Sequence, residues 1–175
     1  CGSFSGKVRH MKIASAYAAT IFYGDFVKLV NTGTVEKDTG TATATPVGIF
    51  MGCFYTDPST SQPTFNQQWP TGTVASDAMA YVLDDPDAVF RMQADGSLAQ
   101  TTLGNNIAII QTAGTTQAGR SKNAVDASTA ATTNTLPLRI LEFMIGPDSE
   151  VGDAFTDVLL TYNEGMQQYR NATGV

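Results

Sequence analysis

The sequence predicts a mainly β protein, and three observations support this class. Short apolar runs of five to ten residues recur along the chain, and Gly, Pro, Asp or Asn closes most of them. The runs are rich in Val, Ile, Phe, Tyr and Thr, which favour strands, and helical periodicity is scarce. We therefore expect a compact β-sandwich or small β-barrel with long loops.

Eight runs are the expected strands. In chain order they begin at Val8, Asp25, Val47, Ala78, Ala88, Ile107, Leu136 and Phe155. At most one or two short helices are expected, near 14–19 and 164–170. The stretches 56–77 and 112–135 are long and irregular, and such loops in a compact domain are usually functional or ordered by a partner.

The length and charge limit the possible classes of protein. At 175 residues the chain fits a single β domain, expected at 11–175, after an extended N-terminal arm at 1–10. The formal net charge of −6 argues against a nucleic-acid partner, because phosphate binding needs clustered Lys and Arg. No apolar run is long enough to span a membrane.

The segment YVLDDPDAVFRMQADG, 81–96, places Asp84, Asp85 and Asp87 around Pro86. This composition favours a hairpin turn, because proline fixes its own φ and aspartates bond to nearby backbone amides. Calcium binding is the sharper alternative, but the spacing of an EF-hand loop is missing. We expect no metal site here.

Other motifs also fall short of a catalytic or cofactor site. The segment 114–121, GTTQAGRS, resembles a phosphate-binding loop, but Arg120 replaces its lysine and no amphipathic helix follows. His10 is the only histidine, and two cysteines with one histidine cannot form a four-ligand zinc site. Cys53 is expected in the core. The sequence therefore predicts a protein that is not an enzyme and that has no cofactor.

Two aromatic residues, Phe65 and Trp69, lie in the first irregular stretch. Aromatic residues in a polar loop are good contact anchors at interfaces. The alternative is that they fold back onto the core of the domain.

Several segments together resemble the capsid decoration, or cement, proteins of tailed bacteriophages. They are VRHMKIASAYAATIFYGDFVKLV, TPVGIFMGCFYTDP, AYVLDDPDAVFRMQADGSL, LGNNIAII, GRSKNAVDASTAATTNTLPLRILEF and YRNATGV. The order and spacing of the segments, from about Val8 to Val175, carry the resemblance. Phe26 is a departure, since comparable proteins often have proline after the preceding Gly-Asp.

The resemblance implies a β-tulip-like fold and a structural virion protein on the outer surface of the capsid. Such a protein is a homotrimer that clamps neighbouring subunits of the major capsid protein, its partner. The exposed N-terminal segment could add a strand to a neighbouring sheet, so Phe4, Val8 and Arg9 are candidate contacts with the capsid or within the trimer, together with Phe65 and Trp69.

A β-sandwich binding module is the alternative function. Exposed aromatic residues such as Trp69 and Tyr162 would stack on sugar rings, and the acidic segment 84–87 would hold calcium. In this interpretation Cys1 is the lipid-bearing first residue of a surface protein.

Overall fold

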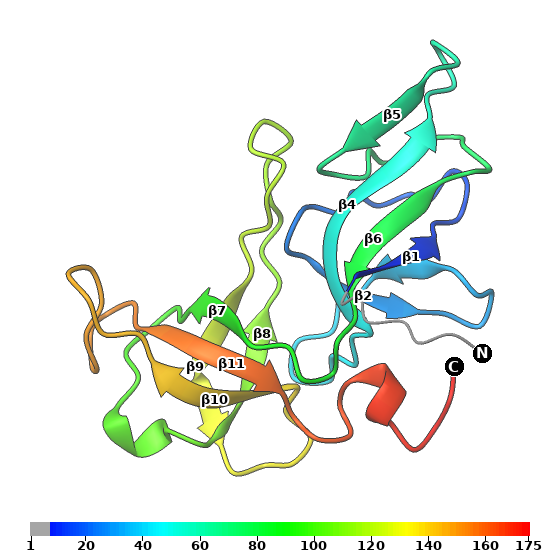
Figure 1. The fold of residues 1–175 in the computed structure, drawn as a ribbon. Helices are drawn as coiled ribbons and strands as arrows, with labels where there is room; N and C mark the ends of the chain where they lie inside the picture. The colour runs from blue at the N-terminus through cyan, green and yellow to red at the C-terminus, as the bar shows by residue number, and fades with distance from the viewer. Residues whose placement is uncertain (1–7) are drawn as a thin grey trace.

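The structure is a computed structural model, and it describes residues 8–175 (Figure 1). One antiparallel sheet has the strand order β1-β6-β4-β2-β3, with β5 paired to β4. Its strands are β1 (Val8–Lys12), β2 (Phe26–Leu29), β3 (Val35–Lys37), β4 (Gly48–Thr56), β5 (Pro63–Asn66) and β6 (Met79–Leu83). We call it the first sheet.

The second antiparallel sheet has the order β7-β11-β10-β8-β9. Its strands are β7 (Phe90–Gln93), β8 (Asn106–Ile110), β9 (Ala124–Ala131), β10 (Leu138–Phe143) and β11 (Asp157–Tyr162). Within residues 8–175 the only helical segments are two 3₁₀ turns, Gln100–Thr102 and Gln168–Arg170. The predicted mainly β class, with at most two short helices, is confirmed. No closed barrel forms among these residues, and the two sheets are consistent with a compact sandwich.

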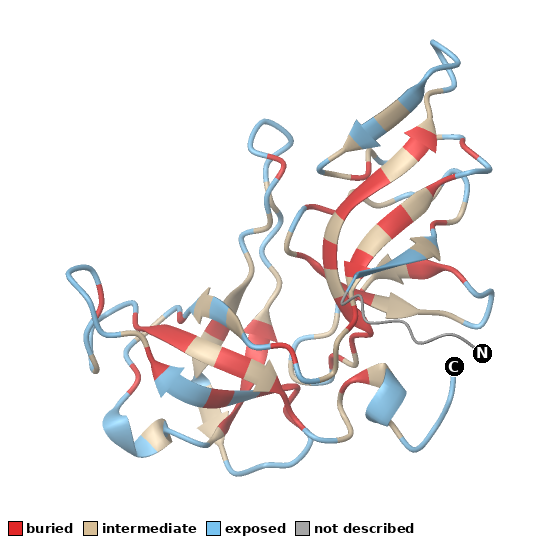
Figure 2. Ribbon diagram, in the orientation of Figure 1, coloured by how far each residue is buried: buried red, intermediate tan, exposed pale blue. Residues whose placement is uncertain are grey.

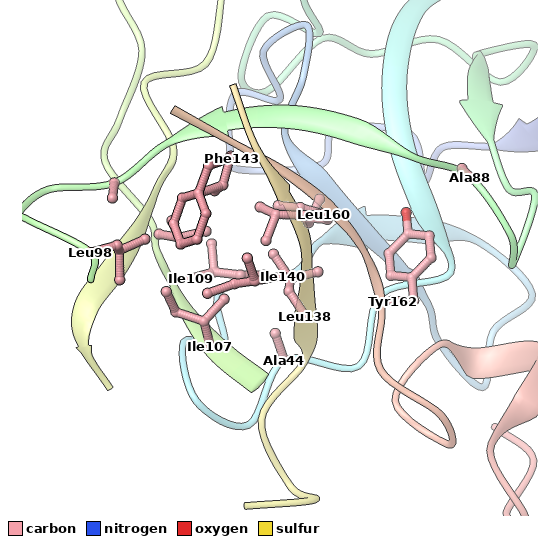
Figure 3. Close-up of a cluster of buried hydrophobic side chains, with 14 residues drawn as sticks. Ala44, Ala88, Leu98, Ile107, Ile109, Leu138, Ile140, Phe143, Leu160 and Tyr162 are labelled. Carbon is pink, nitrogen blue, oxygen red and sulfur yellow. The ribbon is translucent and has the colours of Figure 1, made fainter. Parts of the chain in front are cut away.

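Each sheet curls around its own cluster of buried side chains. In the first sheet a bridge between Ile13 and Val35 links the two edges, and in the second a bridge between Ala94 and Val125 does the same. The first cluster lies in the first sheet and includes Ile13, Val27, Phe50, Trp69 and Val82. The second cluster lies in the second sheet and includes Ile107, Ile109, Leu138, Ile140 and Leu160. Figure 3 shows the second cluster, in which side chains from β8, β10 and β11 point toward one another.

The first sheet also contributes to the second cluster. Phe26, Ile49 and Leu83 pack against the second cluster, whereas their chain neighbours belong to the first. Alternation along β2, β4 and β6 produces this division, because successive side chains in a strand point to opposite faces. The buried and less buried residues alternate along β4 in Figure 2.

Strand β4 keeps its core side chains inward by means of a bulge. The register with β6 shifts between Phe50 and Cys53, so both of these residues reach the first cluster despite their odd spacing. Gly52 lies at the bulge with φ of 127°. A Cβ there would meet the carbonyl oxygen of Asn66 at 3.1 Å. The bulge therefore requires glycine.

All eight apolar runs contain strands, but three strands were not predicted. β3 has only three residues, β5 begins with Pro63, and β9 is rich in Ala, Ser and Thr. The helix expected at 14–19 is wrong. That segment forms turns, and Ala16 has φ of 60°, which a right-handed helix does not allow. The second expected helix is reduced to the 3₁₀ turn at Gln168–Arg170.

The predicted N-terminal arm falls partly within the described residues. Val8 to His10 belong to β1, which pairs antiparallel with β6. Phe4 and the rest of 1–7 lie outside the described residues.

The C-terminal segment crosses from the second sheet back to the first. The amide of Gln167, which is fully buried, donates to the carbonyl oxygen of Val47 at 2.8 Å. Gln168 accepts from the backbone N–H of Leu29 at 2.6 Å and donates to its carbonyl oxygen at 3.0 Å. The glutamines therefore add polar contacts that hold the two sheets together.

The bulge gives a direct stability prediction. Gly52→Ala places a Cβ at a positive φ against a backbone oxygen, and we expect a loss of roughly 1–3 kcal/mol in the free energy of unfolding. Urea denaturation measures it. Gly146→Ala is the control, because nothing lies within 4 Å of the added Cβ. Equal stability of the two variants would contradict the role given to the bulge.

Candidate interaction surface

The turn at 84–87 is present, but it does not close a hairpin. Ala88 N–H donates to the carbonyl oxygen of Asp85 at 3.1 Å, and Asp87 N–H donates to the Asp85 carboxylate at 2.9 Å. The two flanking strands, β6 and β7, lie in different sheets. The hairpin interpretation is therefore wrong, and the turn carries the chain from one sheet to the other.

Protein groups engage the carboxylates of this turn. Asp84 is 2% exposed, and its Oδ2 lies 3.0 Å from Arg9 Nε and 2.8 Å from the Tyr169 hydroxyl, which donates to it. Asp87 pairs with Arg170 at 2.7 Å. Burial and the hydrogen bond to Asp84 raise the pKa of Tyr169 to about 12. The turn thus fixes the C-terminal segment against β1 and β6.

The other polar motifs have structural surroundings. Within residues 8–175 no group of three or more His, Cys, Asp or Glu side chains is placed to hold a metal ion. Segment 114–121 forms the end of the β8–β9 hairpin, with a bridge between Thr115 and Arg120, and leads into β9 rather than a helix. No helix among the described residues has the length and apolar character needed to cross a membrane.

His10 and Cys53 lie on opposite faces of the first sheet. The His10 ring makes an edge contact with Tyr81, with ring centroids 4.6 Å apart, on the face away from the first cluster. Cys53 is 1% exposed within that cluster, and burial raises the pKa of its thiol to about 12. The thiol donates to the carbonyl oxygen of Gln68 at 3.3 Å.

For Trp69 the structure supports the alternative in which the ring folds back onto the core, and not the contact surface. Its side chain is fully buried and meets Tyr55 edge to face, with centroids 5.4 Å apart. It therefore belongs to the core of this chain rather than to an exposed contact surface. Tyr162, the second suggested sugar-stacking residue, is 6% exposed and packs in the second cluster. Neither ring is available to stack on a sugar.

Phe65 lies in a different environment. It is 73% exposed on β5, and its ring tilts against Phe54 with centroids 5.0 Å apart. The register of β1, β6, β4 and β5 places it on one face with residues from all four strands. We call this the outer face, formed by Val8, His10, Met51, Phe54, Phe65, Met79 and Tyr81, with the exposed Lys12 beside Met79 at its edge.

Most side chains of the outer face are apolar. Val8 and Phe65 are exposed, whereas Met51, Phe54, Met79 and Tyr81 between them are half-buried. On the same face, the cross-strand pair Ile49 and Leu83 packs against the second cluster. Strands β4 and β6 extend beyond this pair, and there the second cluster does not cover them. The second sheet differs, because the outward side chains of β7 and β10 include Arg91, Gln93 and Arg139. A sheet that is apolar on both faces is typical of a strand layer covered on both sides.

Two hollows adjoin the outer face. A shallow one of about 310 Å³ is lined by Tyr23, Met51, Phe65 and Tyr81, among others. A larger one of about 490 Å³, which we call the intersheet cleft, lies between the two sheets. Its apolar lining is Phe26, Ile49, Met51, Leu83, Phe90 and Met92, and its polar lining includes Arg91, Arg120 and Asn123. Tyr23 and Met51 line both hollows, so the two lie side by side.

Sequence reasoning identified Val8 and Phe65, at opposite ends of the outer face, but missed Met51, Met79 and Tyr81 between them. Arg9 projects on the other face of β1 and is held by Asp84. The sequence does contain a signal for this face. In the strand segments GIFMGCFYT and MAYVL, large apolar side chains occupy both odd and even positions, so both faces of each strand are apolar.

Comparisons with protein families, with curated proteins and with solved structures found no match.

The buried carboxylate of Asp84 gives a test of the turn. Asp84→Asn removes the charge that Arg9 and Tyr169 meet, and we expect a loss of about 1.5–3 kcal/mol in the free energy of unfolding. Asp87→Asn is the matched control, because Asp87 is exposed, and little change is expected. Urea denaturation with and without calcium measures both. A strong stabilisation by calcium that Asp84→Asn abolishes would show that the turn is a cation site.

The burial of Cys53 gives a second test. In a Cys1→Ser background, the remaining thiol should react with an aromatic disulfide reagent at least about 100-fold more slowly in the native protein than in urea, because the thiolate is disfavoured and access is blocked. The raised pKa also means that this thiol contributes stability below pH 9, which is lost as the pH rises through about 12. Rapid native labelling would contradict the burial.

Proposed function

We propose that the protein is a structural virion protein that binds the outside of a phage head as a trimer. In this role it clamps neighbouring subunits of the major capsid protein and stabilises the shell. The resemblance of the sequence to capsid decoration proteins suggests this class. The outer face of the first sheet is the observation that supports it most directly.

A clamp needs apolar contact groups on a support that does not deform. Met51, Phe54 and Tyr81 project from central strands of the first sheet, whose opposite side is the fully buried first cluster. Because the backbone of these strands is paired on both sides, little conformational entropy is lost when a partner covers the side chains. Methionine adapts to irregular surfaces, and aromatic groups supply large contact areas.

The energetics of a shell suit several weak contacts. A protein that binds only the assembled shell stabilises it by mass action, like any ligand of the native state. In a trimer three contacts engage together, so avidity can exceed single-site affinity by about 10²–10⁴ when the geometry permits. The net charge of −6 agrees with a position away from packaged DNA.

Among the candidate contacts, Val8 and Phe65 have the exposure that this role requires, at 39% and 73%. The side chain of Arg9 is 54% exposed and lies at the edge of the same sheet. The burial of Trp69 and Tyr162 removes the aromatic groups on which the carbohydrate-binding alternative depended.

The outer face gives a binding prediction. Phe65→Asp places a charge where an apolar contact is proposed, and we expect at least 10-fold weaker association with heads assembled from the cognate major capsid protein. Co-sedimentation measures the association. Leu103→Asp is the control, because Leu103 is also exposed but lies beside the 3₁₀ turn at Gln100–Thr102.

Thermal rupture of the heads provides a second measurement. Heads carrying the unaltered protein should rupture at a higher temperature than stripped heads, and heads treated with the Phe65→Asp variant should resemble stripped ones. Unchanged binding by that variant would remove the outer face from the proposal. Equal robustness of stripped and decorated heads would contradict the cementing role itself.

A further inference from the structure

The loop between β10 and β11 projects away from both sheets (Figure 1). We call residues 144–156 the acidic loop, because it contains Asp148, Glu150 and Asp153 and no basic residue. It also carries two exposed apolar side chains, Ile145 at 75% and Phe155 at 57%. The loop therefore combines apolar groups with negative charge.

Hydrogen bonds hold the acidic loop in one shape. Gly146 and Ser149 form a tight turn, with Gly146 N–H donating to the Ser149 carbonyl oxygen at 2.9 Å. The Ser149 hydroxyl, which is buried, accepts from the backbone N–H of Asp157 at 3.0 Å. Glu150 N–H donates to the Asp153 carboxylate at 2.7 Å. A loop constrained in this way loses little entropy when it enters a partner.

The intersheet cleft has the complementary chemistry. Its floor is apolar and contains Phe90, Met51 and Met92, and its rim carries Arg91 and Arg120. Arg91 is ion-paired with Asp157, whereas Arg120 is exposed and forms no ion pair within the described part of the chain. The buried Oδ1 of Asn123, which also lines the cleft, has no hydrogen-bond partner there. The cleft thus offers apolar contact and an arginine that has no ion-pair partner among residues 8–175.

We propose that the intersheet cleft receives the acidic loop of a second copy of this chain. Ile145 enters the apolar floor, and Asp148 meets Arg120 at the rim. The occupant is a second copy because the chain itself carries both complementary surfaces. The two surfaces adjoin but do not overlap, because Arg91 also lines a hollow formed by residues 144–149, whereas no residue of the acidic loop lines the cleft. One copy therefore does not fill its own cleft with this loop.

A contact of this kind is heterologous, because different surfaces of the two copies meet. Repeated with a rotation that divides a full turn evenly, it forms a closed ring in which every loop and every cleft is used. The inference deepens the trimer of the proposed function and rests on it only for the number of copies. It does not depend on binding to a capsid.

A charge exchange in the isolated protein tests the contact. Light scattering is expected to show a closed oligomer for the unaltered chain. Arg120→Glu and Asp148→Arg should each raise the protein concentration at which the oligomer forms by at least 10-fold, because like charges then meet at the rim. The double variant Arg120→Glu/Asp148→Arg should restore at least half of the lost association energy, since the opposite charges meet again in exchanged positions.

Matched controls separate the contact from general charge effects. Lys122→Glu makes the same change of charge two residues from Arg120, at a position that does not line the cleft, and should leave the oligomer intact. Ile145→Ser should weaken the oligomer, whereas Leu141→Ser, on β10, should not. Circular dichroism verifies that each variant is folded, which is expected because all of these side chains are exposed.

A monomeric unaltered chain would overturn the inference, and so would a double variant no more associated than the single ones. A monomer would also contradict the trimer of the proposed function, whereas a failed charge exchange in an intact oligomer would not. Binding to heads through Phe65 is measured separately and can succeed in either case. Conversely, a closed oligomer with charge rescue that does not sediment with heads would support the contact and contradict the capsid role.

Discussion

The packing of the two sheets against each other depends on strands β2, β4 and β6, which contribute side chains to both hydrophobic clusters. Phe26 and Val27 are neighbours in β2, yet Phe26 packs in the second cluster and Val27 packs in the first cluster. Phe50 and Ile49 divide in the same way in β4. Because one strand layer is buried on both faces at this point, the two sheets cannot separate without exposing both clusters to water. The intersheet cleft and the outer face are the places where this double coverage ends.

Polar contacts reinforce the same junction. Asp25 is fully buried and forms an ion pair with Lys37 at 2.9 Å, while Asn123 from the β8–β9 hairpin donates to it at 3.4 Å. On another side of the first sheet, Asp84 binds Arg9 and Tyr169. Removing one partner of a buried pair leaves an uncompensated charge, so such pairs favour one arrangement of the segments that meet there.

Much of the fold follows from local sequence, and most of the surface does not. The run beginning at Val47 predicts a strand because its residues favour a pleated, half-buried layer. The same run does not reveal which face of β4 meets the second sheet, because that depends on long-range pairing. Strand β9 was missed because its Ala, Ser and Thr residues carry little strand signal and are fixed by pairing with β8. Trp69 shows the limit for sites, since its polar neighbours in sequence gave no sign of complete burial.

The outer face and the cleft lie side by side, and this brings the two proposed contacts close together. Tyr23 and Met51 line the hollow beside Phe65 as well as the cleft. A loop seated in the cleft would pack against one side of Met51, whose other neighbours face the proposed shell contact. Tyr23 and Met51 are therefore the side chains through which occupancy of the cleft would affect the outer face. By linkage, any effect of the seated loop on binding at the outer face is matched by an equal effect of that binding on the loop contact.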